Sequence, residues 1–168
     1  MAMIKPQTLV DANIWINGKH HLGVSSKVKL PNIEFLKTEQ KAGGFEREIF
    51  NGILGKMEGE LTFRTFSDKA FDAAKLSYQS SDHTEILIKA SYYQNGKKYP
   101  IVANWKGNAN VEDKEFEAGG EVERTLKMSI VVADLTINGK QEYQIDSDNM
   151  VLIVGGTDLL SDLRGQIM

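Results

Sequence analysis

The fold of this chain is best predicted from residues Lys27 to Phe66, which read KVKLPNIEFLKTEQKAGGFEREIFNGILGKMEGELTFRTF. In its last part, Lys56 to Phe66, apolar and polar residues alternate: Met57, Gly59, Leu61 and Phe63 fall between Lys56, Glu58, Glu60, Thr62 and Arg64. A period of two is typical of a strand with one face on a core and the other in water. The first part, from Lys27, reaches Pro31, which cannot donate a ladder hydrogen bond and therefore indicates an edge, a bend or a bulge.

A long connection from Glu39 to Gly55 joins these two strands, and we predict it to be a Gly-rich loop. Ordinary hairpin loops are short and polar. This one carries glycines and apolar side chains together, at Ala42, Gly43, Gly44, Phe45, Ile49, Phe50, Ile53 and Leu54. Exposed apolar clusters usually mark interfaces, so we expect the connection to pack against something outside its own subunit.

Composition limits the remaining possibilities. A chain of 168 residues that is 41% hydrophobic can bury one real core, and we expect a single domain over residues 1–168. It has no cysteine, which excludes disulfides and thiolate metal sites. The sequence contains neither a signal peptide nor an apolar run of about 20 residues, so we expect a chain made in the cytoplasm with no membrane contact. The net charge of −3 is interspersed, which excludes a basic stripe that grips nucleic acid.

The segment from Glu85 to Gly107 gives the clearest hairpin signal, with a two-residue turn at Asn95-Gly96. This turn places the apolar residues of both strands on the same face. The expected pairs are Tyr92 with Tyr99, Ala90 with Ile101, Ile88 with Ala103, and Ile86 with Trp105.

Two Asn-Gly-Lys sequences, beginning at Asn17 and Asn138, indicate two further hairpins. We predict three-residue turns at both places, with glycine in the left-handed conformation. The expected pairs are Ile14 with Leu22 and Ala12 with Val24 in the first hairpin, and Leu135 with Tyr143 and Ala133 with Ile145 in the other.

Two helices are predicted. The first runs from Ser67, a possible N-cap, to Tyr78, with Phe71, Ala74 and Tyr78 on one face. The second is short and lies near the C-terminus, with Thr157 as its cap. Its apolar residues are Leu159, Leu160, Leu163 and Ile167.

Between the hairpins, the polar and acidic segment from Asn108 to Gly120 is expected to be a surface loop. A long strand then begins at Glu121. Both of its faces become apolar between Ile130 and Ala133, and the alternation continues afterwards with the opposite parity. This change indicates a bulge.

The search for chemistry finds no catalytic, cofactor or metal site. His20, His21 and His83 lack metal-ligand spacing, and surface positions explain them better. The run Asp146 to Asn149 lacks the glycine and distal glutamate of a calcium loop, so we interpret it as a turn. Trp15 and Trp105 lie among apolar hairpin residues, which favours core packing over ligand stacking. We therefore expect a structural protein and no enzyme.

The predicted fold class is mainly β, an antiparallel β-sandwich or barrel with one flanking α-helix and a short C-terminal helix. Its many half-polar strands leave unpaired edges, and a sheet that closes through several copies of a chain removes such edges. Head-to-tail copies that close form a ring, and rings with complementary ends stack into a tube.

The order and spacing of short motifs over almost the whole chain resemble the major tail tube protein of contractile-tailed bacteriophages and R-type bacteriocins. The motifs are Ile14-Trp15-Ile16-Asn17-Gly18, Val28-Lys29-Leu30-Pro31, Glu39-Gln40-Lys41-Ala42-Gly43-Gly44, Leu135-Thr136-Ile137-Asn138-Gly139-Lys140, Ile145-Asp146, Asn149-Met150, Gly155, Asp158-Leu159 and Arg164. Each motif is weak by itself, and together they are fairly specific.

The resemblance implies hexameric rings that stack into the inner tube of a virion tail or phage-tail-like particle. The partners it implies are other copies of the chain, a sheath protein, a tape measure protein and a baseplate hub, with DNA passing through a phage tube without specific binding. The long loop, residues 42–54, would reach the neighbouring ring. Candidates for the lumen wall are Lys56, Glu58, Glu60, Thr62, Arg64, Glu121, Glu123, Thr125 and Lys127, an acid-leaning mixture.

Two alternatives remain open from the sequence. One is the hemolysin-coregulated tube protein of type VI secretion, whose ring can carry effector proteins. The other is a monomeric β-barrel that binds a small ligand in its interior.

Overall fold

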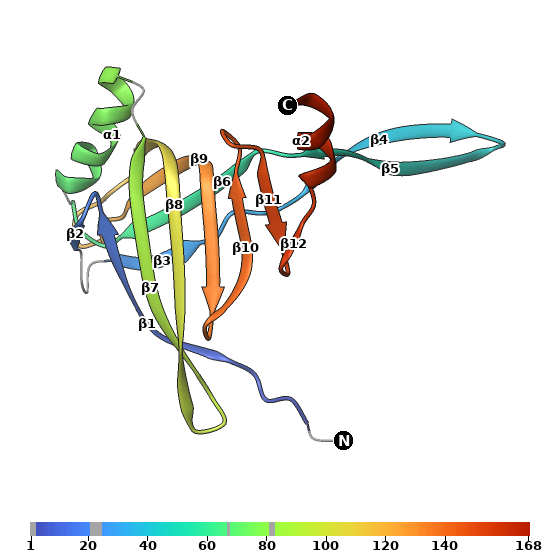
Figure 1. The fold of residues 1–168 in the computed structure, drawn as a ribbon. Helices are drawn as coiled ribbons and strands as arrows, with labels where there is room; N and C mark the ends of the chain where they lie inside the picture. Colours follow the sequence, from blue (N-terminus) through green and yellow to red (C-terminus); the bar gives the residue numbers. More distant parts are fainter. Residues whose placement is uncertain (1–2, 21–24, 67, 81–82) are drawn as a thin grey trace.

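The computed structural model describes residues 3–20, 25–66, 68–80 and 83–168 of the chain (Figure 1). Most of the described residues lie in antiparallel strands, which confirms the predicted β-rich class with two helices. The strands are β1 Thr8–Ile16, β2 Lys19–His20, β3 Ser25–Lys29, β4 Phe35–Ala42, β5 Phe45–Leu54, β6 Met57–Phe63, β7 Thr84–Gln94, β8 Lys97–Asp113, β9 Arg124–Ile137, β10 Lys140–Asp146, β11 Val151–Val154 and β12 Thr157–Asp158. The helices are α1 Asp68–Ser80 and α2 Ser161–Ile167.

Ten strands form one forked sheet. Its main run has the order β12-β11-β10-β9-β8-β7-β1-β2, while β6 pairs with β9 and β3 pairs with β6. The fork arises because one edge of β9 pairs with two strands. Its residues 124–130 pair with β6, and its residues 132–137 pair with β10. Figure 1 shows β3 and β6 crossing behind β7 and β8, so the branch closes over the main run. The core lies between them.

The irregularity predicted between Ile130 and Ala133 is present. The register of β8 and β9 shifts between Lys106 and Gly107, which lie opposite Val132 and Ile130. Gly107 is required there because a Cβ atom at this position would lie 2.0 Å from the Ser129 carbonyl oxygen. After the shift the buried set changes parity, from Leu126 and Met128 to Ala133 and Leu135.

The core centres on Trp105, which is buried as predicted. Gly59 lies directly beneath its ring, since a Cβ atom there would approach the indole to 2.9 Å. The alternating strand is confirmed by the burial of Met57, Gly59, Leu61 and Phe63 in β6. Strand β6 therefore turns its apolar side chains toward the subunit interior, where Trp105 of β8 also lies.

Turn chemistry was predicted correctly at one hairpin and only in part at the other two. Every expected pair of the Asn95-Gly96 hairpin is present. The turns at Asn17-Gly18 and Asn138-Gly139 hold two residues, not three, because Ile16 faces Lys19 and Ile137 faces Lys140. Asparagine and glycine both have positive φ in all three turns, which is the geometry of a two-residue hairpin.

The pairs expected beyond these two turns have different outcomes. In the later hairpin, a register shift between Gln141 and Tyr143 restores the predicted pairs of Leu135 with Tyr143 and Ala133 with Ile145. In the first hairpin, the predicted partners Leu22 and Val24 lie outside the described residues.

The two predicted loops are largely strands. The connection from Glu39 to Gly55 continues into a hairpin, β4 and β5, and the prediction of a loop there is wrong. The segment from Asn108 extends β8 as far as Asp113, with Ala109 fully buried, and only the part after Asp113 is a connection. The next strand begins at Arg124, so Glu121 precedes it.

The helices use different faces from those predicted. In α1 the buried residues are Ala70, Ala73 and Ala74, whereas Phe71 and Tyr78 are 46% and 58% exposed. Small residues face inward because the helix lies close to the sheet: the Thr84 hydroxyl donates a 2.7 Å hydrogen bond to the Ala73 carbonyl oxygen. The proposed cap Ser67 lies outside the described residues.

The C-terminal helix α2 begins at Ser161, so Thr157 is not its cap and instead lies in β12. Leu160 packs against the core, but Leu159, Leu163 and Ile167 are exposed. The described helices include none with the length and apolarity that crossing a membrane requires.

Candidate assembly surfaces

The β4–β5 hairpin projects from the body of the protein (Figure 1). Its strands pair only with one another and form a separate two-stranded sheet. An isolated two-stranded hairpin is at best marginally stable in water. The hairpin is anchored at its base, where the Gly55 N–H donates a 2.7 Å hydrogen bond to the Glu34 carbonyl oxygen. Beyond the base, it lacks a covering layer within the described chain.

Local sequence explains why this segment forms a hairpin. Gly43 and Gly44 have φ values of 62° and 80°, which fits a tight two-residue turn between Ala42 and Phe45. Near the base, the register shifts so that Phe35 faces Leu54 while Lys37 faces Phe50. The extra residues of β5 include Gly52, which has a φ of 78°.

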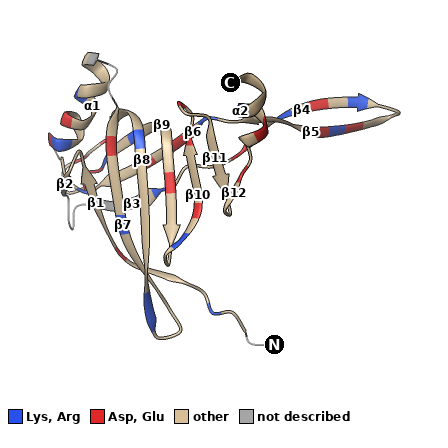
Figure 2. Ribbon diagram, in the orientation of Figure 1, with Lys and Arg blue, Asp and Glu red and all other residues tan. Residues whose placement is uncertain are grey.

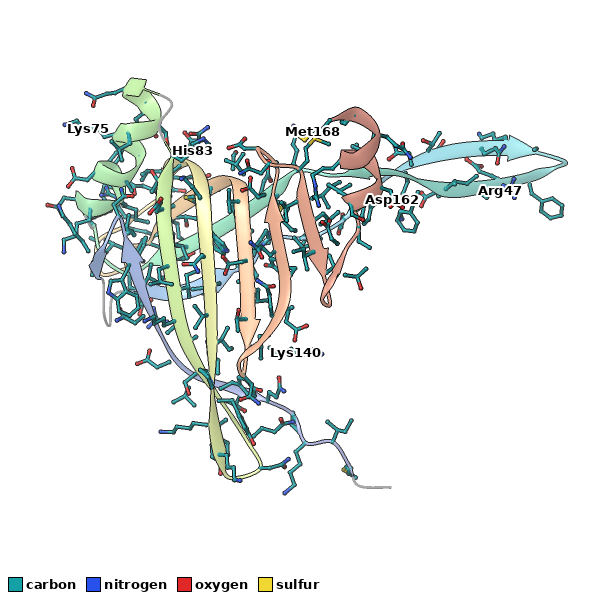
Figure 3. All side chains as sticks on the ribbon, viewed as in Figure 1. Arg47, Lys75, His83, Lys140, Asp162 and Met168 are labelled. Carbon is teal, nitrogen blue, oxygen red and sulfur yellow. The ribbon has the colours of Figure 1, made fainter. Side chains whose placement is uncertain are left out.

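The two faces of the hairpin differ in chemistry. Residues directly opposite each other share a face, and one face holds the ion pairs Lys37–Glu48 (2.9 Å) and Lys41–Glu46 (3.4 Å) together with Phe50. The other face, which we name the tip face, consists of Thr38 and Ile49, Gln40 and Arg47, and Ala42 and Phe45. Arg47 Nε donates a hydrogen bond to Gln40 Oε1 over 2.9 Å, and Figure 3 shows Arg47 near the outer part of the hairpin.

The apolar side chains of the hairpin are largely in water. Phe45 is 79% exposed, Phe50 67%, Ile53 58% and Ile49 44%. Monomeric soluble proteins rarely expose so many large apolar side chains on one element, and such surfaces mark interaction sites. Of the sequence candidates for this surface, only Leu54 at the base is partly buried against the core.

A second surface is the polar face of the branch. Pairing registers align β8, β9, β6 and β3, and their polar residues lie opposite one another on the side away from the core. This branch face contains Asn108, Asn110 and Glu112 from β8, Thr125, Lys127 and Ser129 from β9, Glu58, Glu60 and Thr62 from β6, and Lys27 and Lys29 from β3.

Positive and negative side chains are neighbours on the branch face. Lys127 forms an ion pair with Glu112 across β8 and β9, and Glu60 lies opposite Lys127 on one side and Lys29 on the other. The hydrogen bond to Glu112 and its negative charge raise the pKa of Lys127 above the ordinary value, and the charges of Glu60 and Glu58 act in the same direction. The lysine therefore stays protonated in an acid-rich setting.

The structure brings together only part of the predicted lumen set. Glu58, Glu60, Thr125 and Lys127 are neighbours on the branch face. Thr62 lies there too, but it is buried between its partners on β3 and β9. The other candidates lie outside the strands: Lys56 and Arg64 flank β6, and Glu121 and Glu123 precede β9.

Sequence reasoning missed the contributions of β8 and β3. Asn108, Asn110 and Glu112 were assigned to a loop, although the small apolar residues Gly107, Ala109 and Val111 continue a period of two between them. That alternation was the available signal. Lys27 and Lys29 can be placed on this face only from the pairing of β3 with β6.

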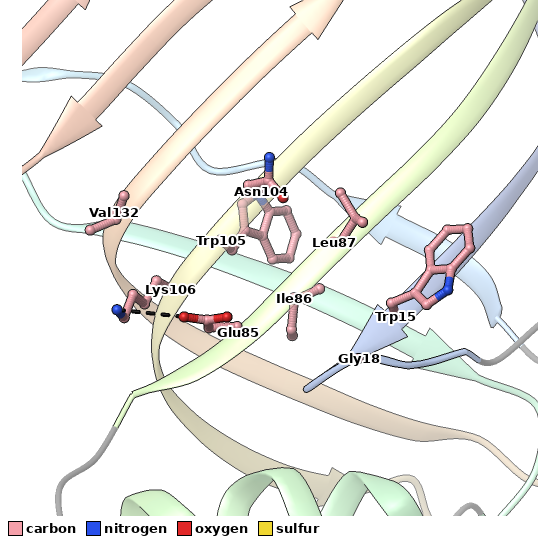
Figure 4. A pocket seen from close by; sticks show the side chains of 9 residues that line it. All are labelled: Trp15, Gly18, Glu85, Ile86, Leu87, Asn104, Trp105, Lys106 and Val132. Atoms are coloured by element: carbon pink, nitrogen blue, oxygen red, sulfur yellow. Dashed lines mark ion pairs between the residues drawn. The ribbon is translucent and has the colours of Figure 1, made fainter.

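A shallow pocket of about 430 Å³ lies on the main run, lined by residues of β1, β7, β8 and β9 (Figure 4). Trp15, which was expected in the core, is half-buried here, and Lys89 Nζ lies 5.3 Å from the centre of its ring. An exposed ion pair, Glu85–Lys106 (3.5 Å), crosses the pocket. The interior of the sheet is filled by core side chains, so the space expected of a ligand-binding barrel is occupied.

The run Asp146 to Asn149 is a turn, as predicted. Asp146 Oδ1 accepts hydrogen bonds from the backbone N–H groups of Asp148 and Asn149, each over 3.0 Å. The Asn149 side chain donates to Asp146 Oδ2 over 2.7 Å, and these bonds lower the pKa of Asp146. His83 is half-buried just before β7, while the side chains of His20 and His21 lie outside the described residues. Within the described chain, no cluster of three or more acidic or histidine side chains could hold a metal ion.

An uncovered hairpin, exposed apolar side chains and an ordered polar sheet face together define a structural subunit of a larger protein assembly. The chain belongs to the family described as phage tail tube protein FII, whose model matches residues 6–167. This match confirms the resemblance noted from the motifs. The chain is a tail tube protein of a contractile phage tail or a related injection system.

Three individual proteins are similar to this chain to different degrees. The tail tube protein of Escherichia phage P2 is 23% identical over 180 residues, and the alignment covers 98% of this chain and 99% of the relative. A solved chain from the PVC sheath/tube terminator of an extracellular contractile injection system in the extended state has a TM-score of 0.57 and 15% identity, covering 80% of this chain and 99% of that chain. A chain of the anti-feeding prophage baseplate has a TM-score of 0.46 and 12% identity over 82% of this chain and 98% of its own length.

Proposed function

We propose that this protein acts as a single domain that forms hexameric rings, and that these rings stack into the inner tube of a contractile phage tail or phage-tail-like particle. The observation that supports stacking most strongly is the β4–β5 hairpin, which projects, lacks its own core and exposes Phe45, Phe50 and Ile53. In the proposed tube, the hairpin crosses to the neighbouring ring and buries these side chains there. Membership of the tail tube family supports a sheath around the tube and a baseplate at its end.

The branch face is the proposed lumen wall. Its apolar side already serves the subunit core, so only the polar side is free to face a channel. Its negative residues are Glu58, Glu60 and Glu112, and its positive residues are Lys27, Lys29 and Lys127. The expected excess of acid is therefore balanced once β3 and β8 are included (Figure 2 shows the charges over the whole chain).

A wall on which charges of both signs are intermixed suits a conduit. Charges of opposite sign are equal in number on this face, and salt screens each of them beyond about one Debye length, roughly 10 Å. A polyanion such as DNA then meets neither a basic surface that holds it nor a strong repulsive field. We propose that DNA passes through such a lumen without specific binding when the tube belongs to a phage.

Electron microscopy of the purified protein and of a hairpin-deletion variant tests stacking. The variant replaces residues 37–52 with an Asn-Gly turn, which keeps the Phe35–Leu54 pair and the Gly55 to Glu34 hydrogen bond. We expect the unmodified chain to form tubes and the variant to form only free rings or soluble subunits with an unchanged core. Long tubes from the variant would show that the hairpin is not the stacking element.

A further inference from the structure

On the basis of the proposed stacking, we infer that the tip face of one copy docks on a group of aromatic side chains at the opposite end of a copy in the next ring. We name this group the aromatic end patch: Phe66, Phe71 and Phe116, held together by Arg124. The contact would be head-to-tail, with different surfaces on the two partners, which is the type that builds continuous stacks.

The aromatic end patch is preformed. The rings of Phe66 and Phe116 meet edge to face, with centroids 5.9 Å apart and an interplanar angle of 77°. The Arg124 guanidinium lies 5.2 Å from the ring centre of Phe66 and 4.7 Å from that of Phe71. Asp113 fixes the guanidinium through two hydrogen bonds, of 2.6 Å and 2.9 Å. A partner therefore meets rings that are already positioned.

The rings of this patch remain accessible although they contact each other. Phe66 is 48% exposed, Phe71 46% and Phe116 68%. Phe71 and the rest of the patch contribute nothing to the buried core, in contrast to the inward alanines of α1. The patch thus has the same property as the tip face: large apolar side chains left in water by the isolated subunit.

The position of the patch fits an intermolecular contact. Phe71 lies in the first turn of α1, and Figure 1 shows α1 and the β4–β5 hairpin at opposite ends of the molecule. The hairpin of a subunit therefore cannot reach its own patch. Subunits placed end to end bring the hairpin of one copy to the α1 end of the next. Helix α2, which exposes Leu163 and Ile167, lies away from α1, toward the hairpin end of the molecule in the view of Figure 1.

Charge also matches across the proposed contact. The connection next to Phe116 carries Glu115, Glu117 and Glu121, all exposed and absent from the ion pairs found among the described residues. Of the residues on the tip face, Arg47 carries the positive charge, between Phe45 and Ile49. An arginine flanked by apolar side chains is suited to a site of aromatic rings bordered by carboxylates.

Site-specific cross-linking tests this contact directly, because the chain has no cysteine of its own. The double variant Ala42→Cys, Glu117→Cys places one thiol on the tip face and one beside the patch, without changing an aromatic residue. We expect assembled tubes treated with a short bismaleimide to give covalent ladders longer than six copies. Each single-cysteine variant should give no such ladder. A control pair, Ala42→Cys with Leu163→Cys on α2, should also give none.

The outcomes separate the two proposals. Tubes without a ladder, ladders that stop at six copies, or ladders from the α2 control would overturn the patch as the receiving surface and leave the tube intact. If the unmodified protein forms no tubes, the proposed function fails and this inference fails with it. As a second test, Phe116→Asp should leave rings and remove tubes, whereas Phe116→Tyr should form both. Normal tubes from Phe116→Asp would contradict the contact.

Discussion

Replacing Leu61 with aspartate tests which face of β6 belongs to the core. Leu61 is fully buried and lies between Val28 of β3 and Leu126 of β9. Removing its side chain from the core loses about 2 kcal/mol of burial. Leaving a carboxyl group there without a partner costs about 2 kcal/mol more. The sum, about 4 kcal/mol, is a large part of the 5–15 kcal/mol by which typical domains are stable.

The matched control is the neighbouring Glu60→Gln. Glu60 lies on the opposite face between Lys29 and Lys127, so a lysine at this position would place three ammonium groups side by side, and glutamine is the cleaner change. Attraction between neighbouring charges that are partly exposed contributes about 1 kcal/mol or less.

Urea unfolding of the unassembled subunits measures both variants. With a slope of about 2 kcal/mol per molar urea, we expect the midpoint to fall by about 2 M for Leu61→Asp and by less than about 0.5 M for Glu60→Gln. Equal midpoints for the two variants, or the larger loss for Glu60→Gln, would refute the assignment of faces and with it the branch face as lumen wall.

Three further predictions concern packing and pH. Gly107→Ala should lower the urea midpoint by more than about 1 M, because its Cβ would overlap the Ser129 carbonyl oxygen. In the control Gly18→Ala the new Cβ meets only open space, although the φ of this residue is positive, so the urea midpoint should fall by less. Thr84→Val should lose about 1–2 kcal/mol, measured by the same unfolding, since it leaves the buried Ala73 carbonyl oxygen without this donor; an unchanged midpoint would contradict the role of this bond. The pKa of Asp146 is lowered from 3.8, chiefly by the hydrogen bond from Asn149, so its contribution is fully present above pH 3.8 and is lost as pH falls through the lower folded-state pKa. Unfolding at pH 6 and pH 3 should therefore show a smaller acid-induced loss for Asp146→Asn than for the unmodified chain, and an equal loss would remove Asp146 from the acid response.

Local signals predicted those parts of the fold in which one short segment determines the geometry. The Asn95-Gly96 turn sets its own register, and the apolar pattern of both strands agrees with it, so every pair could be predicted. The bulge near Ile130 was visible because the buried parity changes there. The hairpin at Asn138-Gly139 shows the limit of this reasoning. Its two-residue turn is followed by a register shift at Glu142, and together they produce the same strand pairs, Leu135 with Tyr143 and Ala133 with Ile145, as a three-residue turn.

The β4–β5 hairpin could not be predicted as strands, for a physical reason. A period of two arises when one face of a strand meets a core and the other meets water. Neither face of this hairpin meets the core of its own subunit beyond the base, so Phe45, Ile49 and Phe50 follow no such pattern. The exposed apolar side chains of this segment are also the reason to expect its partner outside the subunit, and that expectation remains a proposal.

The branch face was only partly predictable because it is assembled from strands distant in sequence. Alternation identified Glu58, Glu60 and Lys127, but the pairing of β3 with β6 adds two lysines that no local pattern connects to them. The balance of charge on the proposed wall therefore depends on topology. In α1, the aromatic residues suggested a buried face, whereas close packing against the sheet selects Ala70, Ala73 and Ala74.

The most direct test of the account is cryo-electron microscopy of the protein after assembly, at a resolution that traces the backbone. The account predicts stacked six-membered rings, with the branch face lining the channel and the β4–β5 hairpin of each subunit crossing into the neighbouring ring. A tube in which the hairpin folds back on its own ring, or in which the branch face points away from the channel, would contradict it.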